Sequence, residues 1–285
     1  MGVDYSSINF RQFIPADTTD MYLAFQDAFG DYPVPPRLTL EEFRYKFIDR
    51  MNLTFEKSVG VWDGNKLVAF IFARVFQDII YYGGMGVRKA YRGHHLLKKL
   101  YEYHESGLLV AGIKVCQLEV LDQNKQAQKI YRNLGYRVNR NLITCQGRLV
   151  SKDIPTDYVV YMLGNEIPWA DIEPWFTCPP AFMSSKAVLI NGSNRDKVFC
   201  VQDHQGLGGL MVGDLINGRV SLLVIRPDLR RQGIASTLLH HFQEKAAVDL
   251  SYFLNVPEEV TEMHSLLSSC GFTQLLKQSE MEKTL

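Results

Sequence analysis

The residues best suited to chemistry lie in one short turn, Arg230-Arg231-Gln232-Gly233-Ile234-Ala235. The turn follows an apolar, strand-like segment and precedes an amphipathic, helix-like one. Such a turn presents successive backbone N–H groups at the positive end of a helix, where anions such as phosphate bind. Gly233 and Ala235 are small where the backbone would approach a pyrophosphate closely, and Ser236 adds a hydroxyl donor. The sequence therefore predicts a site for a phosphate-bearing ligand at this turn.

The segments around this turn recur in the first part of the chain. Three pairs of segments align with offsets of 140, 138 and 136 residues: Val61–Ala69 with Val201–Gly209, Val87–Leu96 with Ile225–Ile234, and Leu118–Tyr136 with Leu254–Phe272. One match of this kind could arise by chance. Three matches in the same order, with a nearly constant offset, predict a duplicated domain.

Each copy also has the same expected order of secondary structure. Period-2 apolar segments predict three strands, which are followed by an amphipathic helix, a buried strand, a short helix ending at a glycine, and a last strand. In the first copy these are 58–63, 66–76 and 79–87, then Leu96–Leu108, Val115–Leu121, a helix ending at Gly135 and a strand at about 137–147. In the second they are 197–202, 207–213 and 219–225, then Ile234–Val248, Tyr252–Val256 and a helix ending at Gly271.

The two copies differ in what precedes these strands. Helices are expected near 18–29 and 39–50 in the first copy, whereas the second has only the short segment Trp169–Phe176. Its aromatic residues Trp169, Trp175 and Phe176 are expected to pack between domains; alternatively, they form a substrate cage. The order predicts an α/β fold of the α+β type, with two tandem domains at 1–163 and 164–285. Each is expected to have a central, mostly antiparallel mixed sheet flanked by helices.

Both copies resemble the GNAT superfamily of acyl-CoA N-acyltransferases, whose signature is [R/Q]-x-x-G-x-[G/A] after the fourth strand. The first copy adds Leu118-Glu-Val through Asn124-Lys-Gln-Ala127 to Tyr131-Arg-Asn-Leu-Gly135-Tyr136. This run is similar to the family's L-x-V…N-x-x-A…Y-x-x-x-G-[F/Y] block. The resemblance covers nearly the whole chain and is of the tandem, two-domain bacterial type. It implies two GNAT-like domains and acetyl-CoA (CoA) as the cofactor.

The resemblance also implies which residues hold CoA, with loop amides on the pyrophosphate and the preceding strand along the pantetheine arm. In the second copy these are Leu223, Val224, Ile225, Arg230, Arg231, Gln232, Gly233, Ile234, Ala235 and Ser236. In the first copy they are Met85, Gly86, Val87, Arg92, Gly93, His94, His95, Leu96 and Leu97. Asn124 matches a position that contacts the pantetheine arm or fixes the following helix; alternatively, it is only a helix N-cap.

Each copy departs from the family pattern in a different place. The first has His95 and Leu97 where the family prefers glycine, although a related R-G-H-R-L pattern occurs in the superfamily. The second keeps its glycine loop, but Val260 and Leu267 align with Asn124 and Tyr131. The candidate acid is therefore absent from the second copy.

Acyl transfer to an amine needs a group that accepts a proton, donors for the developing oxyanion, and an acid for the leaving thiolate. The resemblance implies Tyr131 as the acid, although the same residue could simply pack in the core. Glu119, acting through water, is the candidate base. Asp31 and Tyr32, near a cluster of prolines, are expected to line the acceptor pocket.

The composition excludes several other classes of protein. The 285 residues contain 31 Lys/Arg and 31 Asp/Glu, so net charge gives no case for a nucleic-acid or membrane partner, and the basic region Arg88–Arg148 matches no known nucleic-acid-binding motif. The five cysteines lie far apart, which argues against a zinc site and for a reducing compartment. No signal peptide or membrane span is visible. We expect a cytoplasmic protein without a bound metal.

The sequence thus predicts an N-acyltransferase that moves an acetyl group from acetyl-CoA to a primary amine of a small molecule or peptide. The first copy is expected to be catalytic and the second to support it. Two alternatives remain: a non-catalytic acyl-CoA-binding sensor or scaffold, and catalysis in the second copy with the first supporting it.

Overall fold

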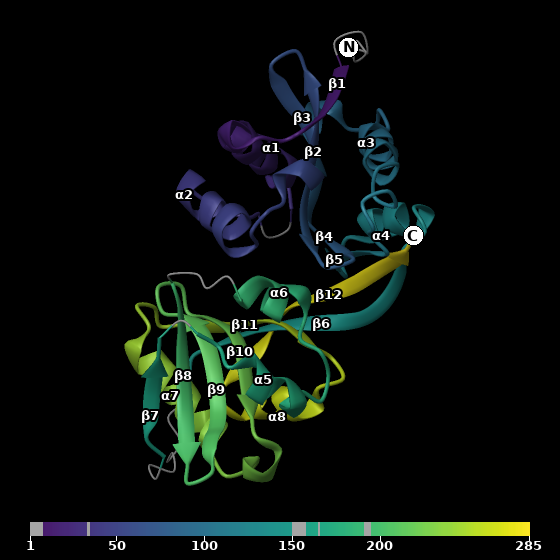
Figure 1. The fold of residues 1–285 in the computed structure, drawn as a ribbon. Helices are drawn as coiled ribbons and strands as arrows, with labels where there is room; N and C mark the ends of the chain where they lie inside the picture. Colours follow the sequence, from purple (N-terminus) through teal and green to yellow (C-terminus); the bar gives the residue numbers. More distant parts are fainter. Residues whose placement is uncertain (1–7, 33–34, 150–157, 165, 191–194) are drawn as a thin grey trace. The chain divides into compact units, whose positions relative to one another are not determined.

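The computed structural model describes residues 8–32, 35–149, 158–164, 166–190 and 195–285 (Figure 1). The chain forms two compact units, and each contains a mixed sheet flanked by helices. Unit 1 consists of Met1–Glu119, Tyr131–Arg137 and Met281–Leu285; unit 2 consists of Val120–Ile130 and Val138–Glu280. The units therefore divide the chain differently from the boundary at 163/164, which stays a prediction about the duplicated sequence.

Unit 1 has the sheet order β1-β2-β3-β4-β5, followed by the end of β12. Its pairs from β1 to β4 are antiparallel, whereas β4 and β5 are parallel. The strands are β1 (Ile8–Gln12), β2 (Val59–Asp63), β3 (Lys66–Phe76), β4 (Ile79–Val87) and β5 (Val115–Leu121). The helices are α1 (Thr18–Phe29), α2 (Leu40–Phe43) with the π-helical turn Arg44–Arg50, α3 (Leu96–Glu105) and the end of α4 (Lys125–Asn133).

The sequence of β3 explains why helices cover both faces of this sheet. Every residue from Leu67 to Ala73 is buried, so the strand shows no polar side chain to solvent on either face. Both α1 and α3 pack against it, and in Figure 1 they lie on opposite sides of the strands. Phe70 and Phe72 stack with their ring centroids 4.4 Å apart, and Phe25 reaches within 6.4 Å of Phe70 from α1.

Unit 2 has the sheet order β12-β6-β11-β10-β9-β8-β7. Here β10 and β11 are parallel, while β6–β11, β10–β9, β9–β8 and β8–β7 are antiparallel. The strands are β6 (Arg137–Gly147), β7 (Val160–Leu163), β8 (Asp196–Asp203), β9 (Gly206–Asp214), β10 (Arg219–Ile225), β11 (Ser251–Pro257) and β12 (Phe272–Thr284). The helices are α5 (Trp169–Ile172), α6 (Lys186–Leu189), α7 (Ile234–Lys245) and α8 (Thr261–Ser269).

Alternation along β9 separates two cores in unit 2. Met211 belongs to the cluster that includes residues of α7 and α8, whereas Leu210 and Val212 belong to the cluster with Trp169 and Ile172 of α5. The sheet is therefore covered on both faces, as in unit 1.

The irregularities of the two sheets match at the offsets of the sequence repeat. Gly83 is an extra residue on β4 opposite β3, and Ser221 is an extra residue on β10 opposite β9. Val68 is likewise an extra residue on β3 opposite β2, and Gly208 is an extra residue on β9 opposite β8. Bulges are specific features that redirect a strand, so their recurrence confirms the prediction of a duplicated mixed α/β domain.

Candidate CoA site

The two parallel strands in each unit separate after a short paired region. Within the described residues, the parallel pairing joins Arg219 and Val220 of β10 to Tyr252 and Phe253 of β11. Beyond it, β10 stays paired with β9 as far as Ile225. In unit 1 the pairing joins Ile79–Tyr82 to Val115–Leu118, and β4 continues alone with β3 to Val87. One edge of β4 and of β10 is thus left open beside a diverging strand.

A cavity of about 570 Å³ lies between the separated strands of unit 2. Its wall is formed by β10, β11, the loop before α7, α8 and the segment from Trp175 to Ser184. Every residue predicted from the second copy lines it except Gln232. The lining residues from the prediction are Leu223, Val224, Ile225, Arg230, Arg231, Gly233, Ile234, Ala235 and Ser236.

The loop at the end of β10 has the backbone shape expected of an anion cradle. Arg231 and Gly233 both have positive φ, at 66° and 88°, and α7 begins directly afterwards at Ile234. The first N–H groups of a helix have no acceptor inside the helix, so they are available to a ligand. The loop therefore presents these donors at one end of the cavity.

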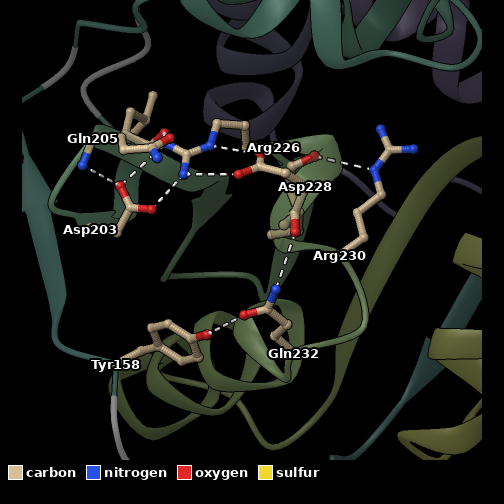
Figure 2. A network of polar contacts seen from close by, with 9 residues as sticks. Tyr158, Asp203, Gln205, Arg226, Asp228, Arg230 and Gln232 are labelled. Carbon is tan, nitrogen blue, oxygen red and sulfur yellow. Dashed lines mark hydrogen bonds and ion pairs between the residues drawn. The ribbon is translucent and has the colours of Figure 1, made fainter.

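Side-chain contacts hold this loop in place (Figure 2). Arg226 lies between Asp203 and Asp228: its Nη1 is 3.2 Å from Asp203 Oδ1 and its Nε is 2.8 Å from Asp228 Oδ1. These hydrogen bonds lower the pKa of both carboxyl groups, so the network stays ionised at neutral pH. Gln232 donates to the Asp228 carbonyl at 3.1 Å and accepts from Tyr158 Oη at 3.1 Å. The Gln232 side chain thus braces the loop and does not line the cavity.

Arg230 fixes the other side of the loop. Its Nε donates to the Ile225 carbonyl at 3.3 Å and its Nη2 to the Trp175 carbonyl at 2.6 Å. In unit 1, Arg92 makes the same pair of contacts with the Val87 and Ala28 carbonyls, at 3.4 and 2.7 Å. The two loops therefore share an arginine that hydrogen-bonds both to the end of its strand and to the helical segment that precedes the sheet.

The unit 1 loop keeps the backbone shape despite its different residues. Gly93 has a φ of 81° and His95 a φ of 57°, and α3 begins at Leu96. His95 occupies the left-handed conformation that glycine adopts in unit 2, at a cost of about 1 kcal/mol for a residue with a Cβ atom. The glycine that the family prefers is absent, but the cradle geometry is retained.

Comparison with known proteins agrees with this geometry. Residues 19–136 match the model of the acetyltransferase (GNAT) family. The first copy therefore contains a GNAT-family acetyltransferase domain over these residues. No curated protein matches its sequence.

Solved structures show that the GNAT fold extends over both copies. A putative acetyltransferase from Pyrococcus horikoshii superposes with a TM-score of 0.71 at 17% identity, covering 100% of this chain and 92% of that one. A GCN5-related N-acetyltransferase from Sphaerobacter thermophilus gives 0.73 at 15% identity, over 98% and 96% of the chains. A tandem GNAT protein from the clavulanic acid biosynthesis pathway gives 0.71 at 10% identity, over 97% and 98%. The predicted tandem GNAT architecture is confirmed.

The predicted acid, Tyr131, lies within the matched domain and is a buried residue of α4 in unit 1. Its ring packs 6.0 Å from that of Tyr136. Burial, and to a smaller extent the neighbouring Tyr32, raise the pKa of Tyr131, so the phenol stays protonated throughout the physiological range. Tyr131 therefore meets the protonation requirement for a general acid and also serves as a core residue.

The other residues predicted in the first copy are distributed between the two units. Asp31 accepts two hydrogen bonds from Arg92, at 2.6 and 3.0 Å, and this pairing lowers the pKa of Asp31 to about 2. Its carboxylate thus holds the unit 1 loop. Glu119 lies partly buried on β5 of unit 1. Asn124 belongs to unit 2, where its Oδ1 accepts from the Ala127 N–H at 3.0 Å and caps α4.

The structure also brings residues to the cavity that sequence reasoning missed. Trp175 and Phe176 line the cavity of unit 2, so they are placed where the alternative of a substrate cage requires, and their packing between domains stays a prediction. Cys178 and Ser184 line it as well. The segment that carries them has little periodicity, and only its position before the first strand of the copy could have indicated a role in the site. Within the described residues, no group of three His, Cys, Asp or Glu side chains is arranged to hold a metal ion.

None of the described helices is both long and apolar enough to cross a membrane.

Proposed function

We propose that this protein transfers an acetyl group from acetyl-CoA to a primary amine of a small molecule or peptide. The observation that carries the proposal is the combination, in each unit, of separated parallel strands with a positive-φ loop that opens a helix. The donor groups of such a loop fit a pyrophosphate, and the open edge of β4 or β10 fits an extended amide-containing arm. The residues present therefore fit CoA.

Unit 1 is the catalytic unit in this proposal. Acetyl-CoA, when bound, supplies an activated thioester carbonyl and a thiolate leaving group. The bulge at Gly83 leaves one residue of β4 out of the ladder with β3, beside the point where β5 diverges, and supports backbone N–H donation to the carbonyl oxygen. Tyr131 holds a proton on Oη for the leaving sulfur, and Glu119 accepts the amine proton through water.

Unit 2 binds acyl-CoA without carrying out transfer in this proposal. Its cavity is well formed, but Leu267, at the position aligned with Tyr131, is buried and has no proton to give. The lack of a proton donor at this position favours a supporting or regulatory role for unit 2. A non-catalytic acyl-CoA sensor is the second candidate function for the whole chain.

The test is release of free CoA thiol from acetyl-CoA in the presence of a panel of small amines and peptides. Tyr131→Phe keeps the ring that packs on Tyr136 but removes the proton, so we expect kcat to fall by about 100-fold or more with little change in KM for acetyl-CoA. The matched control is Tyr103→Phe, an exposed tyrosine on α3, which should leave turnover unchanged. Undiminished turnover in Tyr131→Phe would remove Tyr131 from the mechanism, and no turnover with any amine would favour the sensor.

A further inference from the structure

The cavity of unit 2 contains a hydroxyl group that the protein itself does not use. Ser184 is only 4% exposed and lines the cavity. Its Oγ is buried and, among the described residues, has no hydrogen-bond partner. A buried hydroxyl without a partner is destabilising, so its presence in a cavity wall points to a ligand that completes it.

Neighbouring hydroxyl groups behave differently. Ser265 and Ser269, which also line the cavity, donate to carbonyls of their own helix, Thr261 at 2.9 Å and Leu266 at 2.8 Å. Ser185, the next residue along the chain, donates to the Phe182 carbonyl at 2.7 Å. The missing partner is therefore a property of Ser184 and not of serines in this region.

The position of Ser184 separates it from the phosphate loop. Ser184 ends a 3₁₀ turn, Phe182–Ser184, that packs against both β10 and β11, whereas the loop follows β10 at Ile225. From Ser221, where the bulge lies, to Ile225 the strand covers about 13 Å at about 3.3 Å per residue. A ligand anchored at the loop and extended along β10 would therefore run along a strand that this turn contacts, inside the cavity that Ser184 lines.

The surroundings also suit an acyl group. Apolar side chains of Leu222, Val256 and Met263 line the cavity together with Ser184. A thioester carbonyl is an acceptor that matches a hydroxyl donor, whereas a thiol is only a weak hydrogen-bonding group. Apolar neighbours accept the methyl group, and they strengthen a hydrogen bond that is shielded from water.

We propose that Ser184 donates a hydrogen bond to the thioester carbonyl of acyl-CoA bound in unit 2, so that this unit distinguishes acylated CoA from free CoA. The proposal rests on the proposed function, because it requires CoA to bind along β10. It assigns Ser184 a role in ligand selection and makes unit 2 responsive to the acylation state of the CoA pool.

The experiment is calorimetric titration of the full chain with acetyl-CoA and, separately, with free CoA. Gly233→Asp places a carboxylate in the phosphate cradle of unit 2 and should abolish binding there. The binding sites that the wild type has and this variant lacks are therefore assigned to unit 2. For this class we expect the wild type to prefer acetyl-CoA, and Ser184→Ala to reduce the preference by about five-fold, the effect of one neutral hydrogen bond. Affinity for free CoA should be unchanged.

Ser185→Ala is the matched control, since its hydroxyl closes the same turn. It should lower the melting temperature and leave the preference unchanged, whereas Ser184→Ala should leave the melting temperature of the ligand-free protein unchanged or raise it. Ser184→Cys, a weaker donor, should give an intermediate preference. An equal loss of affinity for both ligands in Ser184→Ala, or no loss, would overturn the role of Ser184 while leaving CoA binding established. If neither acetyl-CoA nor free CoA binds, the proposed function is overturned as well.

Discussion

The buried ion pair between Arg140 and Glu280 in unit 2 provides the most stringent test of the energetics. Glu280 is 1% exposed and accepts from Arg140 Nε and Nη2, at 2.9 and 3.0 Å, and from Asn139 Nδ2 at 3.0 Å. Burial has the largest single effect and lowers the pKa of Arg140, but the hydrogen bond and the charge of Glu280, together with Cys178, raise it overall. Arg140 therefore keeps its positive charge in the folded protein, and its guanidinium forms an ion pair with Glu280.

Arg140→Met removes the cation and keeps an unbranched side chain that replaces the apolar stem of the arginine. It leaves the Glu280 carboxylate buried without a counter-charge, and breaking a buried pair in this way costs about 3–5 kcal/mol. That is a large fraction of the free energy of unfolding of a typical domain. Glu280→Leu should be destabilising for the converse reason. The double variant removes both charges and should recover most of the loss, with a coupling energy of about 3 kcal/mol or more.

Urea unfolding of the four proteins, followed by circular dichroism, measures each free energy and checks that the m-values agree. The reasoning would be refuted if the losses of the two single variants summed to the loss of the double variant within about 0.5 kcal/mol. The two residues would then contribute to stability independently.

The same arginine has a second set of partners that the double variant does not restore. Arg140 Nη1 lies 3.2 Å from Cys178 Sγ, and Nη2 donates to the Pro180 carbonyl at 3.3 Å. Cys178 and Pro180 line the cavity of unit 2. The double variant should therefore regain stability but bind acyl-CoA in unit 2 more weakly than the wild type. Full recovery of affinity together with stability would show that the cavity wall does not need this contact.

Two further outcomes follow from the local geometry. Burial lowers the pKa of His104 to about 4, so below pH 6.5 the unfolded chain binds a proton that the folded protein excludes. The free energy of unfolding should therefore fall by about 3 kcal/mol between pH 6.5 and pH 4. His104→Phe should reduce this loss, as measured by urea midpoints at pH 7 and 4.5. Gly233→Ala should destabilise by about 1 kcal/mol in thermal unfolding, because its φ of 88° is strained for a residue with a Cβ atom. Gly164→Ala, where an added Cβ meets open space, should have no such effect, and an equal cost at both positions would contradict the argument.

Much of the fold could be predicted from sequence because the repeat and the apolar periodicity are local signals. The strand expected near 137–147 is β6 at Arg137–Gly147, and the helix expected from Ile234 begins there as α7. The turn before α7 was predicted from small residues at fixed spacing, Gly233 and Ala235. These features depend on residues within a few positions of one another, and a single sequence contains that information.

The features that could not be predicted depend on contacts between distant segments. Periodicity identifies β6 and the strand beginning at Phe272, but it does not say which sheet each one joins. The hydroxyl of Ser184 was not recognised because a serine in an irregular segment has no distinctive pattern; only the absence of a partner around its buried oxygen marks it. Gln232 is predicted to bind the ligand through its backbone amide, and the sequence does not show that its side chain is held by Asp228 and Tyr158.

The membership of Met281–Leu285 in unit 1 has a consequence for the order in which the protein is made. Glu282 pairs with Gln117 of β5 at 3.2 Å, across 165 residues of chain, and the Leu285 N–H donates to the Lys114 carbonyl at 2.9 Å. During translation β5 therefore emerges long before the strand end that completes its sheet. A nascent unit 1 has an unpaired edge throughout synthesis of unit 2, and such edges are prone to intermolecular pairing. The sheet of unit 1 is therefore completed only after unit 2 has been synthesised.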